Sequence, residues 1–162
     1  MEHFHVRVAS DDLVFSAAHF ITLESGECEQ LHGHNYRVAA EVRGPLGESG
    51  YVTDFRALRE AVRAILGELD HRVLLPTESP LIHIAGDPQE VEVTFGFRRW
   101  VFPRGDCLLL RIANTTAELL AKHIGRRLLA GLTSRGSTRP ELVRIEVEEC
   151  FGRWAVWEST QP

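Results

Sequence analysis

The chain has 162 residues, of which 44% are hydrophobic and 25% are charged, and its formal net charge is −5 at pH 7. This length and composition predict that residues 1–162 form one globular domain, and the acidic balance excludes a general nucleic-acid binder, which needs a basic face. The three cysteines are scattered and make no disulfide framework, and without a signal-peptide pattern or an apolar run of membrane length we expect a cytoplasmic protein with no membrane partner.

Three strands are predicted in the amino-terminal part of the chain. Apolar and polar residues alternate over His3–Ala9, and Leu13–Phe20 is predicted to pair with that segment after a short turn. The third strand, His34–Arg43, follows the same period of two. Between the second and third strands Thr22–Gln30 is polar, so we expect a loop that carries Cys28.

Two His-x-His patterns occur in this part of the chain, and they differ in phase. His3 and His5 alternate with the apolar residues of their strand, so they are expected to face solvent. His32 and His34 instead share the parity of the apolar positions Tyr36, Val38, Ala40 and Val42. If the strand runs back through Gly33, both imidazoles lie on the inward side, where a buried polar group needs a partner. A metal ion is one such partner.

A further histidine and a cysteine lie near this pattern in the sequence. Catalytic zinc sites commonly take three ligands from the protein and leave one position open. His19 together with His32 and His34 would make such a set. Cys28, four residues before His32, is either a fourth ligand or a nearby base. The spacing therefore predicts an open three-histidine zinc site with a thiol beside it.

Two helices are predicted where the period changes from strand to helix. Asp54 is the expected N-cap of the first helix and Gly67 lies near its end. The apolar face of this helix is predicted to be Phe55, Leu58, Val62, Ile65, Leu66 and Leu69. The second helix runs roughly from Thr116 to Ala130 and is expected to end at Gly131.

The segment between the helices is less regular. Residues 72–113 contain a run of period two at Val91–Phe97 and a return at Trp100–Phe102. We expect an inserted hairpin-like region that covers an active site, builds an oligomer contact or is a surface embellishment. Two strands, Leu142–Glu149 and Trp154–Glu158, follow the second helix. Strands before and after a helical layer predict the α+β class.

Several acidic positions stand out next to these elements. Asp70 and His71 directly follow the first helix, and the pattern alone favours a helix-end pair that satisfies backbone groups. Glu118 lies three residues after Thr115, which is the spacing of a capping box. Glu149 is in phase with the apolar residues of its strand, and an inward carboxylate must be paired or bind something. The opposite face of that strand, expected to point outward, is Arg144, Glu146 and Glu148.

Six segments resemble the 6-pyruvoyltetrahydropterin synthase / 6-carboxytetrahydropterin synthase family and occur in the family's order. They are Phe15–His19, Cys28–His34, Val52–Phe55, Leu69–His71, Thr115–Glu118 and Val147–Glu149. The resemblance covers most of the chain outside the 72–112 insertion. It implies a T-fold, or tunnelling fold, with two helices packed on one face of an antiparallel sheet. Strands of several subunits would join into a barrel, as a homotrimer or homohexamer.

The resemblance also implies roles for individual residues. The ligands of Zn²⁺ would be His19, His32 and His34. The catalytic residues would be Cys28, Asp70, His71 and Glu149, with the thiol as proton acceptor and the other three as its relay. The substrate-binding residues would be Thr116, Glu118 and Glu149. Of these, Glu149 would hold the guanidine-like edge of a pterin through charge-assisted hydrogen bonds.

The activity implied by the resemblance is a zinc-dependent lyase reaction on 7,8-dihydroneopterin triphosphate. Its products would be 6-carboxy-5,6,7,8-tetrahydropterin, acetaldehyde and triphosphate, in the pathway to queuosine and related deazapurines. Two alternatives stay open: a 6-pyruvoyltetrahydropterin synthase, which stops after triphosphate elimination, and a zinc-stabilised oligomer that binds a pterin without turnover. The presence of Cys28, His71 and Glu149 favours an enzyme over the binding protein.

Overall fold

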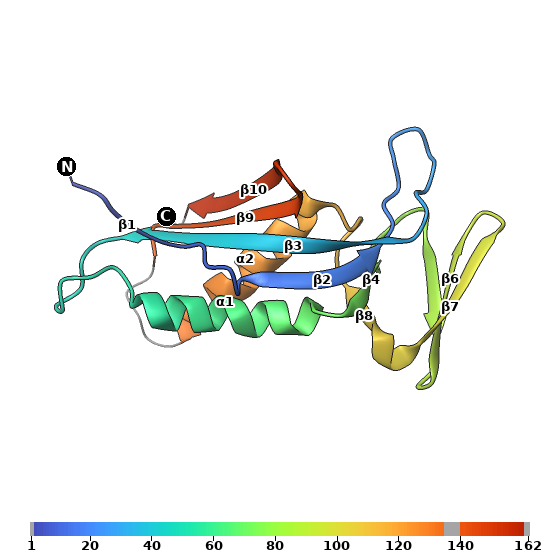
Figure 1. Cartoon of the computed structure of the whole chain (residues 1–162), viewed down its shortest axis with the longest axis horizontal. Coiled ribbons are helices and arrows are strands. Elements are labelled where there is room, and N and C mark those ends of the chain that lie inside the picture. The colour runs from blue at the N-terminus through green and yellow to red at the C-terminus, as the bar shows by residue number, and fades with distance from the viewer. Residues whose placement is uncertain (1, 135–139, 161–162) are drawn as a thin grey trace.

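The computed structural model describes residues 2–134 and 140–160, and a mixed sheet of seven strands dominates this part of the chain (Figure 1). The strands are β1 (Phe4–Val8), β2 (Val14–His19), β3 (His32–Gly44), β4 (Arg72–Pro76), β8 (Cys107–Leu110), β9 (Leu142–Cys150) and β10 (Arg153–Thr160). Their order is β10-β9-β3-β2-β4-β8, and β1 also pairs with β3. The pairs around β3 are antiparallel, whereas β4 runs parallel to both of its neighbours.

The predicted pairing of the first two strands with each other is wrong. Both pair with β3 instead, β1 along Ala40–Gly44 and β2 along His32–Arg37. The reason is that β3 is 13 residues long and offers one edge to both strands. The turn between them closes with the Leu13 N–H on the Ser10 carbonyl at 3.0 Å, and the chain then continues along the same ladder.

Two helices, α1 (Phe55–Leu69) and α2 (Ala117–Ser134), pack on one face of this sheet, as predicted. The side chain of Asp54 caps α1 by accepting a backbone N–H at 2.9 Å, which confirms the expected start. The predicted end of α2 at Gly131 is wrong. A glycine inside a helix costs only about 1 kcal/mol relative to alanine, and Leu132 in the last turn still packs against the core.

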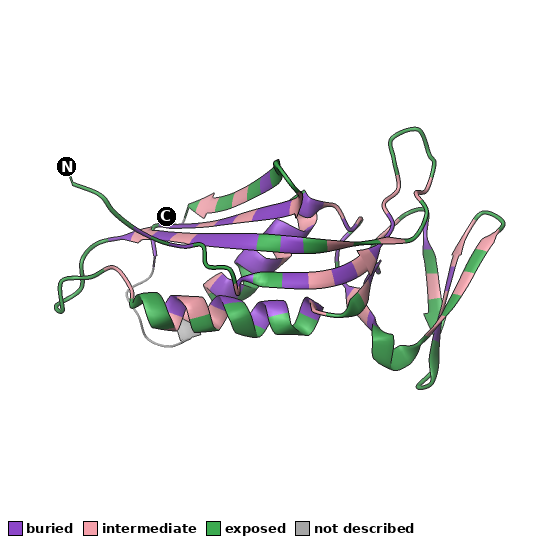
Figure 2. Cartoon of the chain, in the orientation of Figure 1, coloured by how far each residue is buried: buried purple, intermediate pink, exposed green. Residues whose placement is uncertain are grey.

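The core lies between the helices and the sheet (Figure 2). The inward positions of β3 are buried with the predicted parity, and they are Tyr36, Val38, Ala40 and Val42. The buried face of α1 starts at Leu58, because Phe55, which the pattern included, is 61% exposed. Burying each large aliphatic side chain contributes about 1.5–3 kcal/mol. No helix among the described residues is long and apolar enough to cross a membrane.

A second sheet of three antiparallel strands lies beyond the end of the main sheet (Figure 1). Its strands are β5 (His83–Gly86), β6 (Glu90–Phe95) and β7 (Arg98–Pro103), and a short 3₁₀ helix, Arg104–Asp106, leads on to β8. β6 and β7 form the expected hairpin, whereas β4 and β8, from the two ends of residues 72–113, join the main sheet. A separate apolar cluster packs beneath the small sheet: Phe20, Leu75, Ile82, Val91, Val93 and Cys107.

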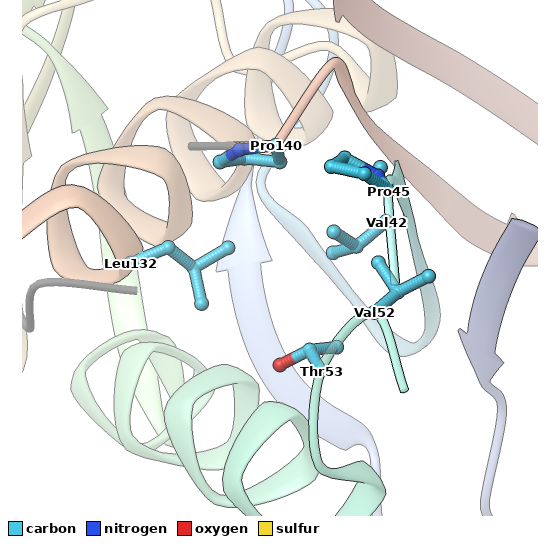
Figure 3. Close-up of a pocket in the computed structure, with 7 residues that line it drawn as sticks. Val42, Pro45, Val52, Thr53, Leu132 and Pro140 are labelled. Atoms are coloured by element: carbon cyan, nitrogen blue, oxygen red, sulfur yellow. The ribbon is translucent and has the colours of Figure 1, made fainter. Parts of the chain in front are cut away.

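A small crevice lies where the end of β3 and the loop after it face α2 (Figure 3). Side chains that line it are Val42, Pro45, Val52, Thr53, Leu132 and Pro140. Its free volume is about 10 Å³, and a cavity needs roughly 10–15 Å³ to hold one water molecule. This crevice is therefore a packing gap that is too small for a substrate.

Close packing of α2 on β10 depends on a glycine. A Cβ atom added at Gly125 would overlap the indole ring of Trp157. We expect Gly125→Ala to lower the free energy of unfolding by about 1–3 kcal/mol, the usual cost of an overpacked core. Gly67→Ala in α1 is the control, because no atom lies within 4 Å of its added Cβ, and it should stabilise by up to about 1 kcal/mol. Urea unfolding measures both, and a Gly125→Ala protein as stable as the wild type would contradict this packing.

Candidate metal centre and active site

Three histidines from two neighbouring strands meet at one end of the sheet. His19 on β2 lies opposite His32 on β3, and His34 is two residues further along the same strand. The strand does run back through Gly33, so both imidazoles of the pair lie on the side of Tyr36, as predicted. Each of the three rings offers one nitrogen, and these atoms lie within 4.8 Å of one another. The structure thus brings together the three predicted metal ligands.

Backbone carbonyls orient two of these rings. The Nδ1 atoms of His19 and His32 lie 2.9 Å from the Thr115 carbonyl oxygen and 2.8 Å from the Gln30 carbonyl oxygen, respectively. A carbonyl only accepts, so each Nδ1 carries the proton and each Nε2 presents a lone pair. The Nε2 atom of His19 lies 3.2 Å from the Tyr36 hydroxyl, which a metal ion would replace as its partner. Histidines that bind a metal through one ring nitrogen commonly donate a hydrogen bond from the other nitrogen to a backbone carbonyl. Burial lowers the pKa of His19 and so favours the neutral imidazole.

His34 supplies the observation that points most directly to a ligand. Its Nε2 atom is buried and has no hydrogen-bond partner among the described residues. The carboxylate of Glu149 is 3.7 Å away, which is too far for a hydrogen bond. A buried nitrogen without a partner is costly, and a metal ion shared with His19 and His32 would satisfy it. Three imidazoles fit the ligand preference of zinc.

Cys28 lies outside this cluster, on the loop that leads to β3. Its loop is closed by a bridge between Thr22 and Cys28, and the residue packs against the apolar cluster beneath the small sheet. The thiol sulfur lies 3.5 Å from the Glu29 carbonyl oxygen. The group of potential metal ligands found among the described residues contains the three histidines and not this sulfur. Burial raises the pKa of the Cys28 thiol, the Arg98 guanidinium opposes the rise and Glu29 adds to it.

Asp70 and His71 pair with each other and with the backbone of β2. The Nδ1 atom of His71 is 2.8 Å from the Asp70 carboxylate. Adjacent side chains meet here because His71 has a positive φ of 55°, which turns its ring back. The carboxylate also accepts the Ser16 N–H at 2.7 Å. This backbone hydrogen bond, with a smaller effect of His71, lowers the pKa of Asp70. Asp70 therefore satisfies a backbone group next to the helix end, as the sequence pattern favoured, and it also pairs with the His71 side chain.

His71 is mostly exposed and faces a cavity. Its side chain is 82% exposed, and it lines an open cavity of about 430 Å³ together with His34, Asn35 and Arg72. His34 is thus the link between the predicted ligands and the predicted relay. The free ring nitrogen of His71 is open to a substrate or to another subunit.

Glu149 and the start of α2 line a second cavity, of about 330 Å³. Thr116 and Glu118 line it as well, so the three predicted substrate residues come together. The expected capping box is wrong, because the Thr116 hydroxyl is the acceptor for the helix amide, that of Leu119, at 3.4 Å. Thr115 is fully buried, and its hydroxyl donates to the Phe20 carbonyl instead. Glu118 therefore lies one position too early for the box and is exposed.

Glu148 corrects another prediction. It was expected on the outward face of β9 together with Arg144 and Glu146, yet it is buried, with only 5% of the residue exposed. Its carboxylate accepts the Gly152 N–H at 2.7 Å and so closes the turn between β9 and β10. Gly152 has a positive φ of 79°, which the turn requires. The Glu148 carboxylate is buried at this turn, where it satisfies a backbone N–H group.

Two residues at the histidine cluster were missed by the sequence reasoning. The Glu29 carboxylate is 3.8 Å from the Nε2 atom of His32, and the Thr115 carbonyl holds His19. Glu29 could have been found from its place three residues before His32, next to Cys28. The Thr115 contact carries no such signal, because any residue has a carbonyl group.

Comparisons with known proteins cover nearly the whole chain. A model of the family described as 6-pyruvoyl tetrahydropterin synthase matches residues 10–160. A Pyrococcus horikoshii protein assigned as a 6-carboxy-5,6,7,8-tetrahydropterin synthase is 35% identical over 115 residues, 70% of this chain and 68% of that protein. A Methanocaldococcus jannaschii protein with the same assignment is 28% identical over 148 residues, 91% and 90% of the two chains.

Solved structures agree with these relatives. The crystal structure of 6-pyruvoyl tetrahydropterin synthase from Plasmodium vivax matches with a TM-score of 0.91 at 29% identity, covering 99% of this chain and 100% of that one. The predicted T-fold, with two helices on one face of a curled sheet, is confirmed by this match.

Proposed function

The chain belongs to the 6-pyruvoyl tetrahydropterin synthase family, and from this premise we propose that it is a zinc-dependent lyase acting on 7,8-dihydroneopterin triphosphate. The products are 6-carboxy-5,6,7,8-tetrahydropterin, acetaldehyde and triphosphate, and the pterin feeds the route to queuosine and related deazapurines. The curated relatives that are assigned as 6-carboxytetrahydropterin synthases favour this product. We place the protein in the cytoplasm, as one T-fold domain in which the small sheet of β5, β6 and β7 is the inserted part of residues 72–113.

The observation that carries the proposal is the unpartnered Nε2 atom of His34, which lies in one group with ring nitrogens of His19 and His32. These three residues would hold the ion. When bound, zinc supplies a Lewis acid for the side-chain hydroxyl groups of the substrate and stabilises the negative charge that develops there. A fourth, open position is what distinguishes such a site from a structural one.

The remaining residues bind the pterin and move its protons. Glu149 accepts the guanidine-like edge of the pterin in a charge-assisted pair, and Thr116 at the start of α2 helps to hold the ring. Cys28 accepts the proton bound to the substrate carbon, and His71, oriented by Asp70, passes it on. Burial raises the pKa of the Cys28 thiol, so formation of its reactive thiolate would be helped by the positive charge of a filled metal site.

A 6-pyruvoyltetrahydropterin synthase is the second candidate, since the matching Plasmodium structures carry that name. The third is an oligomer that binds a pterin without turnover. Incubating the zinc-loaded protein with 7,8-dihydroneopterin triphosphate and measuring released triphosphate separates the two enzymes from the binding protein. We expect release at many equivalents per chain, and binding without release would leave only the third candidate.

Assembly is a testable part of the proposal. Within the described residues β10 lies at one edge of the main sheet and carries Trp154 and Val156, which are 46% and 45% exposed. Open edges with apolar side chains are managed by further pairing or cover, so we expect a homotrimer or homohexamer that joins its sheets into a barrel. Sedimentation velocity at micromolar concentration checks this, and a monomer would contradict both the barrel and a site shared between subunits.

A further inference from the structure

Arg98 on β7 joins the small sheet to the loop of Cys28. One of its guanidinium nitrogens, Nη1, donates to the carbonyl oxygen of Cys28 at 2.7 Å and to that of Glu29 at 3.0 Å. Seventy positions separate Arg98 from Cys28 in the sequence. The contact therefore ties the inserted region directly to the backbone at the predicted proton acceptor.

The guanidinium is itself held by an aromatic stack. Its central carbon lies 4.5 Å from the ring centroid of Trp100, on the same strand. Trp100 in turn stacks on Phe20, with 4.7 Å between centroids and 15° between planes. Phe20 is fully buried and directly follows His19. The small sheet thus contacts both the loop of Cys28 and the residue next to a metal ligand.

We propose that Arg98 is a positioning residue, and that the small sheet of β5, β6 and β7 serves to hold the Cys28–Glu29 backbone in place beside the three histidines. The inference rests on the proposed function for the role of Cys28. The hydrogen bonds from Arg98 to the carbonyl groups of Cys28 and Glu29, which we call the clamp, are a property of the fold. Of the three roles that the sequence left open for this insertion, support of the active site is the one that these contacts favour.

The two ends of the Cys28 loop are held by different side chains. Asn114 holds the other end, donating to the Thr22 carbonyl at 2.8 Å and accepting the Thr22 N–H at 3.2 Å. The carbonyl groups of Cys28 and Glu29 face the guanidinium instead. A planar guanidinium can stack on an indole and donate at the same time, which a lysine ammonium cannot match. Its positive charge also lowers the pKa of the nearby Cys28 thiol, against the effect of burial.

Steady-state kinetics of Arg98→Ala tests the consequence for catalysis. A displacement of about 1 Å at a reacting group can cost roughly a hundredfold in rate, so we expect kcat to fall about 10–100-fold. KM should change less than about threefold, because the pterin pocket at Glu149 is untouched and ground-state binding is kept. Zinc content should equal that of the wild type.

The chain offers a matched control on the same strand. Arg99 is 61% exposed and bonds to Glu92 at 2.7 Å, away from the Cys28 loop. Arg99→Ala removes the same charge and should leave kcat unchanged. Arg98→Lys keeps the charge without the stacked, planar donor, so its kcat should stay near that of Arg98→Ala. A lysine variant with wild-type kcat would overturn the proposed geometry and leave only an effect of charge.

A second readout is independent of activity. Hydrogen exchange of peptides covering residues 21–31 reports the loop amides, such as the Glu29 N–H bonded to the Ile21 carbonyl at 3.0 Å. We expect exchange in Arg98→Ala to be faster by about tenfold or more, since the loop opens locally, and to be unchanged in Arg99→Ala. Equal exchange in the two variants would overturn the clamp. If the wild-type protein shows no turnover, the proposed function fails, and the exchange comparison still decides on Arg98.

Discussion

Cys28→Ala is expected to keep its zinc and its oligomeric state while losing turnover by a factor on the order of 10²–10⁴, the usual worth of a positioned acid–base group. The physical reason is that the thiol lies outside the group of three imidazoles, so its removal takes away a base and not a ligand. Metal analysis and steady-state kinetics on the same preparation measure both quantities.

Glu149→Gln provides the contrast to this variant. It should also keep its zinc, but it should weaken pterin binding by about ten- to a hundredfold, because a hydrogen bond to a charged group contributes about 1.5–3 kcal/mol. The two variants therefore separate proton transfer from substrate binding. A Cys28→Ala protein without zinc would make the cysteine a fourth ligand, and one with full activity would remove it from the mechanism.

His32→Ala and His34→Ala are expected to lose both the metal and the activity. A catalytic zinc site with three protein ligands has none to spare, and we expect less than about a tenth of the wild-type zinc after dialysis, because ligand loss acts directly on metal affinity. In His34→Ala the buried nitrogen without a partner disappears as well, so the metal-free protein should not be less stable than metal-free wild type.

The other His-x-His pattern supplies the control for these variants. His5 is exposed, and its Nδ1 atom lies 2.7 Å from the Glu41 carboxylate on the neighbouring strand. His5→Ala should therefore retain about one zinc per chain, the content of a single three-histidine site. Zinc in His32→Ala and His34→Ala equal to that in His5→Ala would refute the proposed site.

The phase of the two histidine pairs shows what the sequence can predict. Period-two alternation places His32 and His34 with Tyr36 and Val38 on the buried side, and His5 on the other. This inference needs only the geometry of a strand. The cap at Asp54 was predicted for the same reason, since it depends on residues three positions apart.

Contacts between distant segments were harder to predict. Two adjacent threonines precede α2, and either could cap it. Thr116 does so because the hydroxyl and carbonyl of Thr115 are used by Phe20 and His19, almost a hundred positions earlier. The role of Arg98 could not be predicted from the sequence either, because its hydrogen-bond partners are main-chain carbonyls, which every residue has. The pairing of β1 and β2 with the same edge of β3 likewise depends on contacts between segments that are distant in the sequence.

The most direct test of the account is the identity of the pterin that the zinc-loaded protein makes from 7,8-dihydroneopterin triphosphate, determined by mass spectrometry with acetaldehyde measured in the same reaction. We predict 6-carboxy-5,6,7,8-tetrahydropterin and one equivalent of acetaldehyde per pterin, both absent with His34→Ala. A pyruvoyl product without acetaldehyde would contradict the proposed carbon–carbon cleavage, and recovery of unchanged substrate would contradict the assignment of a lyase.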